Sequence, residues 1–293
     1  MGFGLEVRTA AAAEGGVNAG RNWKRHAFVG ENVGHAPMGR GYGRADCREA
    51  PEGLRPRLTG APARGAVGNA HLEPIWKLLK IRGGIGRGEI IADTGRSSRH
   101  FTVLLEGMAC MATRHEDGAR QIYAFHHRGD FLGLHGLLHP HSTEHIEVEA
   151  LSTCTVGTID RDVLEQTIQR NPAVGRTLWR AAMVEASIFR QRLLMVRWPA
   201  MQRIAHLLCE QLSRLEPGTR MIPLNQIEVA DTVGLSIVHA NRSFQELRKL
   251  GVLAEKRCIE VVDTKRLKEL AVFDSRYLDP SEFLSRWDLR IEA

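Results

Sequence analysis

Paired cysteines and long apolar runs are missing from this sequence of 293 residues. No apolar stretch approaches the ~18 residues that a membrane-spanning helix needs, so we expect no membrane partner. The cysteines are few and far apart along the chain: Cys47, Cys110, Cys154, Cys209 and Cys258. Without a Cys-x-x-Cys pair, neither a zinc ribbon nor a cysteine-held iron–sulfur cluster is indicated. Isolated cysteines are typical of a reducing compartment, and we expect a cytoplasmic protein.

Positive charge is concentrated in the first 70 residues. The chain has 40 Lys and Arg against 34 Asp and Glu, and residues 1–70 contribute +4 of the net charge of +6. They also hold 14 of the 29 glycines. We expect residues 1–70 to form a disordered leader, because they cannot bury enough apolar surface to offset the entropy of ordering. A basic arm that touches DNA is the alternative. The basic charge is therefore poor support for DNA binding by the rest of the chain.

Residues 71–170 combine short alternating segments with turn signals. Leu72–Ile81 has helical spacing, and apolar residues then alternate between 101 and 105 and between 146 and 150. Glu116-Asp117-Gly118 and Arg128-Gly129-Asp130 are typical of tight turns. Several short strands at this spacing predict an antiparallel β jelly-roll barrel, followed by a short helix over 160–170.

A long helix is predicted over residues 171–198. Asn171 followed by Pro172 is a favourable helix start, and Trp198-Pro199 ends the segment. The apolar residues of this helix spread over more than one face. Such a helix usually packs its own domain on one side and a partner on the other.

The spacing of small residues between 228 and 250 is typical of a helix-turn-helix. Ala230 allows two helices to cross closely, Gly234 permits the turn between them, and Ala240 packs back against the first helix. Ser236 is the expected cap of the second helix. Residues 251–263 read as a β-hairpin, so we predict a winged helix-turn-helix domain over 199–270 and a C-terminal tail over 271–293.

The outer face of the second helix carries side chains suited to reading bases. Arginine suits guanine, asparagine and glutamine suit adenine, and the helix start with Ser236 suits a phosphate. A basic wing tip suits the DNA backbone. The predicted contacts with double-stranded DNA are Ser236, Ile237, Val238, His239, Asn241, Arg242, Gln245, Lys256 and Arg257.

These segments together resemble the CRP/FNR family of bacterial transcription regulators over residues 71–270. The resemblance rests on Gly88-Glu89, Leu105-Glu106-Gly107, the run from Gly129 to Gly133, Val233 to Ser236, and Asn241-Arg242. It implies an α+β fold with a cyclic-nucleotide-binding-type barrel, a dimerisation helix and a winged helix-turn-helix. It also implies a symmetric dimer on a near-palindromic site, RNA polymerase as a further partner, and a base-contacting role for Arg242.

Two positions depart from the family's pattern. Cyclic-AMP-binding members place Arg-Ser about ten residues after the Gly-Glu of the phosphate loop, whereas this chain has Glu144 and His145 there. A carboxylate facing a phosphate is repulsive, so we predict no binding of cyclic AMP in the usual way. Val238 stands where the family often has a base-reading glutamate, which predicts a different operator. The candidate effector-pocket residues are Gly133, Leu134, His135, Glu144 and His145.

Seven histidines lie between residues 115 and 145, which raises the possibility of a haem or metal site or of a cupin-like metalloenzyme. The cupin pattern needs a carboxylate four or five residues after the second histidine of His139-x-His141, and those positions hold His145 and Ile146. We therefore predict no enzyme activity, no catalytic residue, no metal ligand and no cofactor. A regulator that responds to a cyclic nucleotide, haem or a metal remains the alternative.

Overall fold

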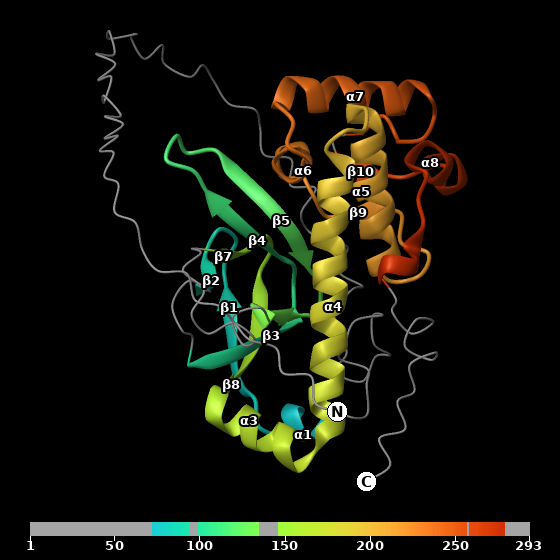
Figure 1. Ribbon diagram of the computed structural model, residues 1–293. Coiled ribbons are helices and arrows are strands. Elements are labelled where there is room, and N and C mark those ends of the chain that lie inside the picture. Colours follow the sequence, from blue (N-terminus) through green and yellow to red (C-terminus); the bar gives the residue numbers. More distant parts are fainter. Residues whose placement is uncertain (1–71, 94–98, 135–145, 257, 279–293) are drawn as a thin grey trace, which may run out of the picture. The chain divides into compact units, whose positions relative to one another are not determined.

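The computed structural model describes residues 72–93, 99–134, 146–256 and 258–278 (Figure 1). The predicted leader, residues 1–70, lies outside them. Among the described residues, no helix combines the length and the apolar character needed to cross a bilayer.

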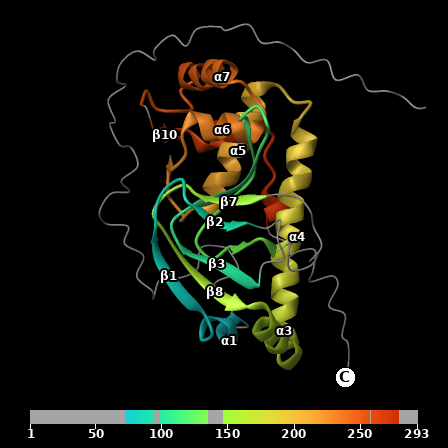
Figure 2. The same cartoon turned by 90° about the vertical axis from the view of Figure 1, so that its left-hand side faces the viewer.

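The described residues between 80 and 160 form two four-stranded antiparallel sheets with the strand orders β1-β8-β3-β6 and β2-β7-β4-β5 (Figure 2). Strands from distant parts of the sequence are neighbours in both sheets, as a jelly-roll barrel requires. The predicted antiparallel barrel is thereby confirmed. The strands are β1 (Lys80–Ile85), β2 (Ile90–Asp93), β3 (His100–Glu106), β4 (Ala109–Arg114), β5 (Arg120–His126), β6 (Phe131–Leu132), β7 (Glu147–Ala150) and β8 (Cys154–Asp160).

Both predicted turns lie between consecutive strands. The turn at 116–118 joins β4 to β5 and is closed by the amide of His115, which donates to the carbonyl of Ala119 at 2.8 Å. The turn at 128–130 joins β5 to β6. At the start of β4, Gly107 has a φ of +89°, and a Cβ there would lie 2.4 Å from the carbonyl oxygen of Thr153. Only glycine allows the chain to pass so close at this point.

The helix predicted over Leu72–Ile81 is wrong in its length. Helix α1 (Glu73–Trp76) is a single turn, and Lys80 already belongs to β1, where it pairs with Thr158 of β8. Leu72 and Ile75 are fully buried, but Leu78 is 43% exposed. Leu79 packs against the same cluster as Leu72 and Ile75, but from outside the helix. After this turn, the backbone pairs with strand β8 at the edge of the barrel and no longer continues the helix.

Helix α3 (Arg161–Arg170) and the long helix α4 (Pro172–Met195) follow the barrel as predicted. Asn171 occupies the N-cap position of α4, but its side chain makes no capping hydrogen bond, contrary to expectation. The first turns of α4 are instead held by packing: Val174 and Leu178 share an apolar cluster with Phe101 and Phe131 of the barrel.

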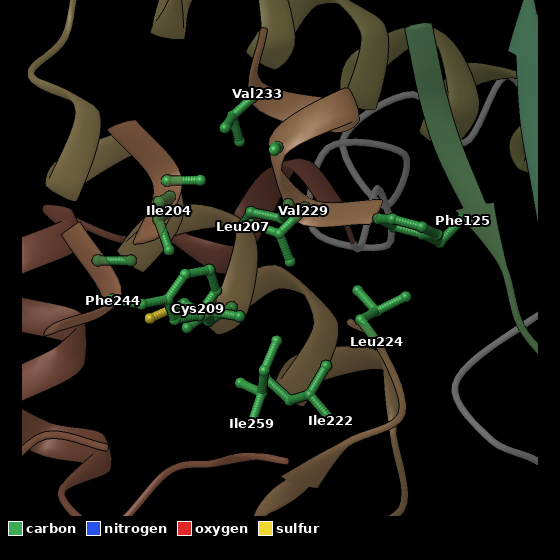
Figure 3. Packing of buried hydrophobic residues seen from close by; sticks show 14 of the residues in the cluster. Phe125, Ile204, Leu207, Cys209, Ile222, Leu224, Val229, Val233, Phe244 and Ile259 are labelled. Atoms are coloured by element: carbon green, nitrogen blue, oxygen red, sulfur yellow. The ribbon is translucent and has the colours of Figure 1, made fainter. Parts of the chain in front are cut away.

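The remaining elements form the C-terminal domain around a buried apolar core (Figure 3). Ile204 and Leu207 meet Val229 and Phe244 there, and all four are fully buried. Helix α7 buries one face of period near 3.6, whereas α5 is buried on all sides from Ile204 to Gln211, as the central helix of the domain. The elements are α5 (Ala200–Arg214), β9 (Met221–Ile222), α6 (Gln226–Val233), α7 (Ile237–Lys249), β10 (Ile259–Glu260), α8 (Thr264–Ala271) and the 3₁₀ helix η3 (Ser275–Leu278).

Candidate nucleic-acid interface

Helix α6 and the turn after it are built by local sequence. The Asn225 side chain accepts from the amide of Glu228 at 2.9 Å, and the Glu228 carboxylate accepts from the amide of Asn225 at 2.8 Å. This reciprocal capping box satisfies two amides at the helix start that have no partner within the helix. Gly234 ends α6 in the left-handed conformation, with φ of 64°. A side chain there would be strained, so glycine makes the sharp turn into α7 possible.

Helix α7 buries one face and exposes the other. Ala240, Ser243, Phe244 and Leu247 are buried against the domain core. At the start of the helix, the Ser236 hydroxyl accepts from the amide of His239 at 3.4 Å, as its predicted capping role requires. The helix therefore cannot roll about its axis without losing this buried face, which fixes the direction of its exposed side chains.

The structure brings most of the predicted DNA contacts together on that exposed face. All of those on α7 and at its cap are exposed, including the guanidinium-bearing Arg242. Ile237 and Val238 are 48% and 57% exposed, although they are apolar. Side chains three and four positions apart share one side of a helix, so the residues predicted to read bases form one surface. We call it the reading face: Ser236, Ile237, Val238, His239, Asn241, Arg242 and Gln245.

The predicted wing differs from a regular hairpin. Leu253 and Val261 form an isolated antiparallel bridge, and the regular strand β10 pairs with β9 instead. At the wing, the exposed Lys256 forms an ion pair with Glu260 at 2.6 Å, so its charge is partly compensated. Arg257 lies outside the described residues.

Two arginines that the sequence analysis missed hold the helix-turn-helix in place. Arg203 of α5 donates to the carbonyl of Val233 at 2.8 Å, at the end of α6. Arg248 of α7 donates to the carbonyls of Ala254 and Lys256 at 3.3 and 3.1 Å, and so ties the wing to the reading helix. No periodicity singles out these arginines, because their acceptors are main-chain carbonyls whose position depends on the fold.

The barrel also contacts α6 through charged side chains. Arg120 of β5 pairs with Asp231 at 2.9 Å, and Arg87 pairs with Glu228, whose side chain is 1% exposed. Gln121 donates to the carbonyl of Thr232 at 3.3 Å. These contacts join residues more than 100 positions apart in the sequence, and the sequence analysis did not find them. Partners across such a distance become visible only once the chain has folded.

Gly133 and Leu134 are the described residues of the predicted effector pocket. Gly133 has a φ of 72° at the end of β6, and Leu134 is 3% exposed within the cluster of Phe101, Phe131 and Leu178. Leu134 thus packs in the apolar layer between the barrel and helices α1, α3 and α4. His135, Glu144 and His145 lie outside the described residues, so the predicted repulsion toward a phosphate stays a prediction.

Buried histidines and cysteines of the described residues serve packing, whereas His100 and His115 of the barrel are exposed. Burial, aided by the charge of Arg214, lowers the pKa of His127 to about 4, and its Nε2 lies 3.0 Å from the Gln211 side-chain oxygen. Burial raises the pKa of Cys110 and of Cys209 to about 12, so neither is a reactive thiolate at neutral pH. Within the part of the chain that the structure covers, no three His, Cys, Asp or Glu side chains are grouped to hold a metal ion.

Comparisons with known proteins agree with this geometry. The family described as "Cyclic nucleotide-binding domain" matches residues 85–171, and the family described as "Crp-like helix-turn-helix domain" matches residues 202–270. The transcriptional activatory protein AadR of Rhodopseudomonas palustris is 30% identical over 175 residues, which cover 57% of this chain and 72% of AadR. The transcriptional activator protein FnrL of Cereibacter sphaeroides is 28% identical over 200 residues, 64% of this chain and 79% of FnrL.

A solved structure shows the same fold. FixK2 from Bradyrhizobium japonicum superposes with a TM-score of 0.58 at 24% sequence identity, and the match covers 67% of this chain and 98% of FixK2. The match therefore extends over nearly the whole of that protein and leaves about a third of this chain outside it.

Proposed function

This chain belongs to the CRP/FNR family of transcription regulators, and we propose that it acts as a homodimer that grips a near-palindromic DNA site with two reading faces. It is a DNA-binding regulator of transcription and not an enzyme. The observation that carries the proposal is the reading face itself. Helix α7 is anchored by a fully buried Phe244, while Asn241, Arg242 and Gln245 remain exposed.

The side chains of the reading face are complementary to the base edges in the major groove of DNA. Arg242 suits the O6 and N7 atoms of guanine, and Asn241 and Gln245 suit the N6 and N7 atoms of adenine. Ser236 and the amides at the start of α7 suit a backbone phosphate, and His239 suits a base acceptor or a phosphate. Val238 lacks an acceptor for the amino group of cytosine and offers apolar contact with a thymine methyl group instead. The half-site therefore differs from one read by a glutamate.

The outward face of α4 supports the homodimer. Trp179, Met183 and Leu193 are 54%, 37% and 75% exposed, and with Ala186 and Arg190 they follow the alternating spacing of four and three residues. That spacing is the heptad pattern of paired helices. Two copies joined along α4 would place their α7 helices in successive major grooves, about 34 Å apart.

We also propose that the barrel does not respond to cyclic AMP in the usual way. The sequence motif supports this, because Glu144 and His145 replace the pair that holds the ribose and phosphate in cyclic-AMP-binding relatives. The alternative is a regulator that responds to a cyclic nucleotide, because the barrel matches that domain family. Calorimetry with cyclic AMP and cyclic GMP separates the two. We further propose that the protein acts in the cytoplasm and that it contacts RNA polymerase.

Selection from a random DNA library tests the proposed function directly. The full chain should enrich two related half-sites in inverted orientation, with centres about 10–10.5 base pairs apart. Arg242→Ala should enrich a half-site that is degenerate at one position, because the bidentate contact is gone. Arg170→Ala, an exposed arginine at the end of α3, serves as the control. Enrichment of no motif by the full chain, under conditions where it is folded, would contradict the proposal.

A further inference from the structure

The segment after α8 returns to the base of the C-terminal domain. Val272 ends α8 in the left-handed conformation, with φ of 47°, and Phe273 then donates its amide to the carbonyl of Lys268 at 3.1 Å. The 3₁₀ helix η3 follows directly and packs against α4. We call residues 272–278 the strap. A non-glycine residue with positive φ costs free energy, so the contacts made by the strap must compensate for it.

Aromatic rings of the strap enclose His206 of α5. The Tyr277 ring lies parallel to the imidazole within 15°, with centroids 5.9 Å apart, and Phe273 meets the imidazole edge-on at 5.1 Å. Trp198 lies in the short connection between α4 and α5, and the centroid of its ring is 5.3 Å from that of the same imidazole. His206 is 1% exposed, and burial lowers its pKa. One neutral ring therefore joins the strap, α5 and the α4–α5 connection.

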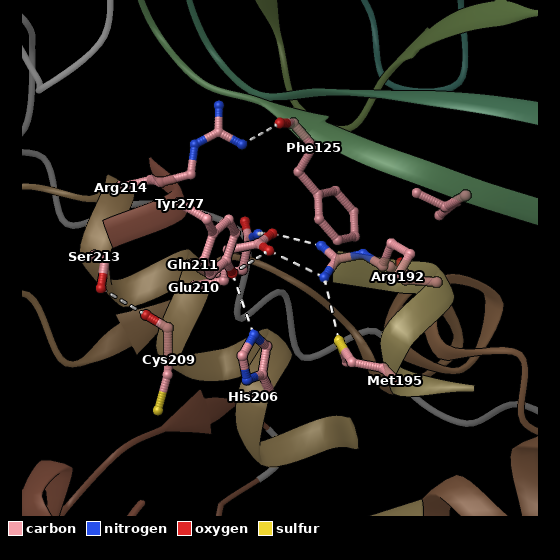
Figure 4. A network of polar contacts seen from close by, with 12 residues as sticks. Phe125, Arg192, Met195, His206, Cys209, Glu210, Gln211, Ser213, Arg214 and Tyr277 are labelled. Atoms are coloured by element: carbon pink, nitrogen blue, oxygen red, sulfur yellow. Dashed lines mark hydrogen bonds and ion pairs between the residues drawn. The ribbon is translucent and has the colours of Figure 1, made fainter. Parts of the chain in front are cut away.

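A buried carboxylate joins the same elements by polar contacts (Figure 4). The Tyr277 hydroxyl donates to Oε2 of Glu210 at 2.7 Å, and Arg192, near the end of α4, donates to the same oxygen at 3.0 Å and to Oε1 at 2.5 Å. Gln211 also donates to Oε1, at 3.2 Å. Both carboxylate oxygens therefore have two donors.

Because Glu210 is buried and charged, it needs its hydrogen-bond donors to stay in place. Its side chain is fully buried, and burial alone would raise its pKa, but Arg192 and the Tyr277 hydroxyl hold the pKa below its ordinary value. A buried carboxylate that stays ionised needs every donor in place, since an unmade hydrogen bond to a charge is costly where water is excluded. Small changes in the angle between α4 and α5 would pull these donors away.

We propose that Tyr277 is a positioning residue that, through Glu210 and Arg192, fixes the angle between α4 and the DNA-binding domain and so sets the half-site spacing that the dimer accepts. This inference rests on the proposed function, namely pairing along α4 and reading by α7. In such a dimer the two α4 helices are fixed against each other. The contacts of the strap with α4 and α5 then determine where each reading face lies relative to α4.

The test measures DNA affinity as a function of spacing. The selected half-sites are placed in inverted pairs at the preferred spacing and with one or two base pairs added or removed, and a fragment with a single half-site is included. The variants are Tyr277→Phe and a truncation after Asp274, which removes η3. The matched controls are Tyr123→Phe, whose hydroxyl makes no hydrogen bond with any described residue, and a truncation after Leu278, which keeps the strap.

The full chain and both controls should prefer one spacing over the two-base-pair changes by about tenfold or more, since both half-sites must be reached at once. Tyr277→Phe should reduce that preference about threefold or more, and the truncation after Asp274 should nearly abolish it. Affinity for the single half-site should not change. Thermal unfolding followed by circular dichroism identifies any variant that is not folded, and Tyr277→Phe then decides the outcome.

Two results would overturn the inference while leaving the proposed function intact. One is a Tyr277→Phe protein with the same spacing profile as the full chain. The other is an equal loss of affinity at every spacing and on the single half-site, which would assign the strap a purely stabilising role. Failure of the full chain to bind any pair of half-sites would instead contradict the proposed function, and the inference with it.

Discussion

Helices α4 and α7 are both amphipathic, but their outward faces differ in chemistry. The outward face of α4 carries large apolar residues such as Trp179 and Leu193, whereas that of α7 carries Asn241, Arg242 and Gln245 in its middle. Apolar surface in heptad spacing suits an identical helix, and amides with a guanidinium suit the hydrogen-bonding edges of bases. The exposed side chains of each helix therefore indicate the chemistry of its partner, whereas the buried side chains only fix the position of the helix in its own domain.

The inward faces differ as well. α7 presents Ala240, Ser243, Phe244 and Leu247 to the core, while α4 also buries a carboxyl group. The Oε1 atom of Glu185 is buried without a hydrogen-bond partner among the described residues. The buried face of α7 thus carries no ionisable group, whereas that of α4 combines packing with one.

The largest effect is expected from charging the outward face of α4. Trp179→Glu combined with Leu193→Glu should abolish the dimer and reduce affinity for a two-half-site fragment by about 10²–10⁴-fold, because the two reading faces no longer act together. Analytical ultracentrifugation and fluorescence anisotropy measure the two quantities. Arg180→Glu, exposed but about 100° around the helix from Trp179, is the control. A double variant that stays dimeric would exclude α4 as the dimer contact.

On α7, removing the guanidinium should change specificity without changing assembly. Arg242→Ala should cost about 1–3 kcal/mol of discrimination at one base pair and leave the dimer intact. The measurement is competition between the selected site and a site substituted at each position in turn. Unchanged discrimination at every position would remove Arg242 from the readout.

The buried carboxyl of α4 predicts a pH dependence of stability. Burial, together with the nearby negative charge of Asp130, raises the pKa of Glu185 from 4.5 to about 7, although Arg214 opposes the shift. The folded state therefore holds this proton more tightly than the unfolded chain does, so the contribution of Glu185 to stability falls as pH rises from 4.5 to 7.

Replacing Glu185 should remove this slope. Glu185→Gln should be more stable than the parent above pH 7, by about 3 kcal/mol, and nearly equal to it below pH 4.5. Urea unfolding across this pH range measures the difference. Glu165→Gln, a carboxyl on α3 that is 57% exposed, should leave the slope unchanged. Parallel stability curves for the parent and Glu185→Gln would show that the carboxyl titrates normally.

A smaller effect is expected at the start of α7. Ser236→Ala removes the acceptor for the amide of His239 and should lower the free energy of unfolding by about 1 kcal/mol, whereas Ser236→Thr should retain most of it. Chemical denaturation measures both. Because the bond is long, at 3.4 Å, the loss belongs at the lower end of the range for helix caps. Equal losses from alanine and threonine would argue against capping.

The smallest effect is expected at the wing. Lys256→Ala should weaken binding equally for all sequences and reduce the slope of log affinity against log salt by about 1, as for one phosphate contact. Its ion pair with Glu260 competes with that contact. Lys77→Ala is a matched control, because Lys77 pairs with Glu73 at 2.9 Å in the same relative spacing on the barrel side. An unchanged salt slope would remove Lys256 from the interface.

Much of the fold and of the reading face was predictable because it depends on local rules. Period-two alternation predicted the barrel strands, and Ala230, Gly234 and Ala240 predicted the helix-turn-helix, whose geometry limits side-chain size and backbone φ at those positions. The helix expected over Leu72–Ile81 was wrong because spacing alone cannot tell a first helical turn from the start of an edge strand. The register with β8 decides between them.

Sequence alone specified the order of the elements, the buried face of α7 and the chemistry that α7 exposes. These follow from the alternation of apolar and polar residues and from a few small residues at turns. The tertiary structure alone decided which charged groups meet: Arg120 with Asp231, and Arg192 and Tyr277 with Glu210. An ion pair between distant residues leaves no periodic trace in the sequence, because it depends on the folded path of the chain between them.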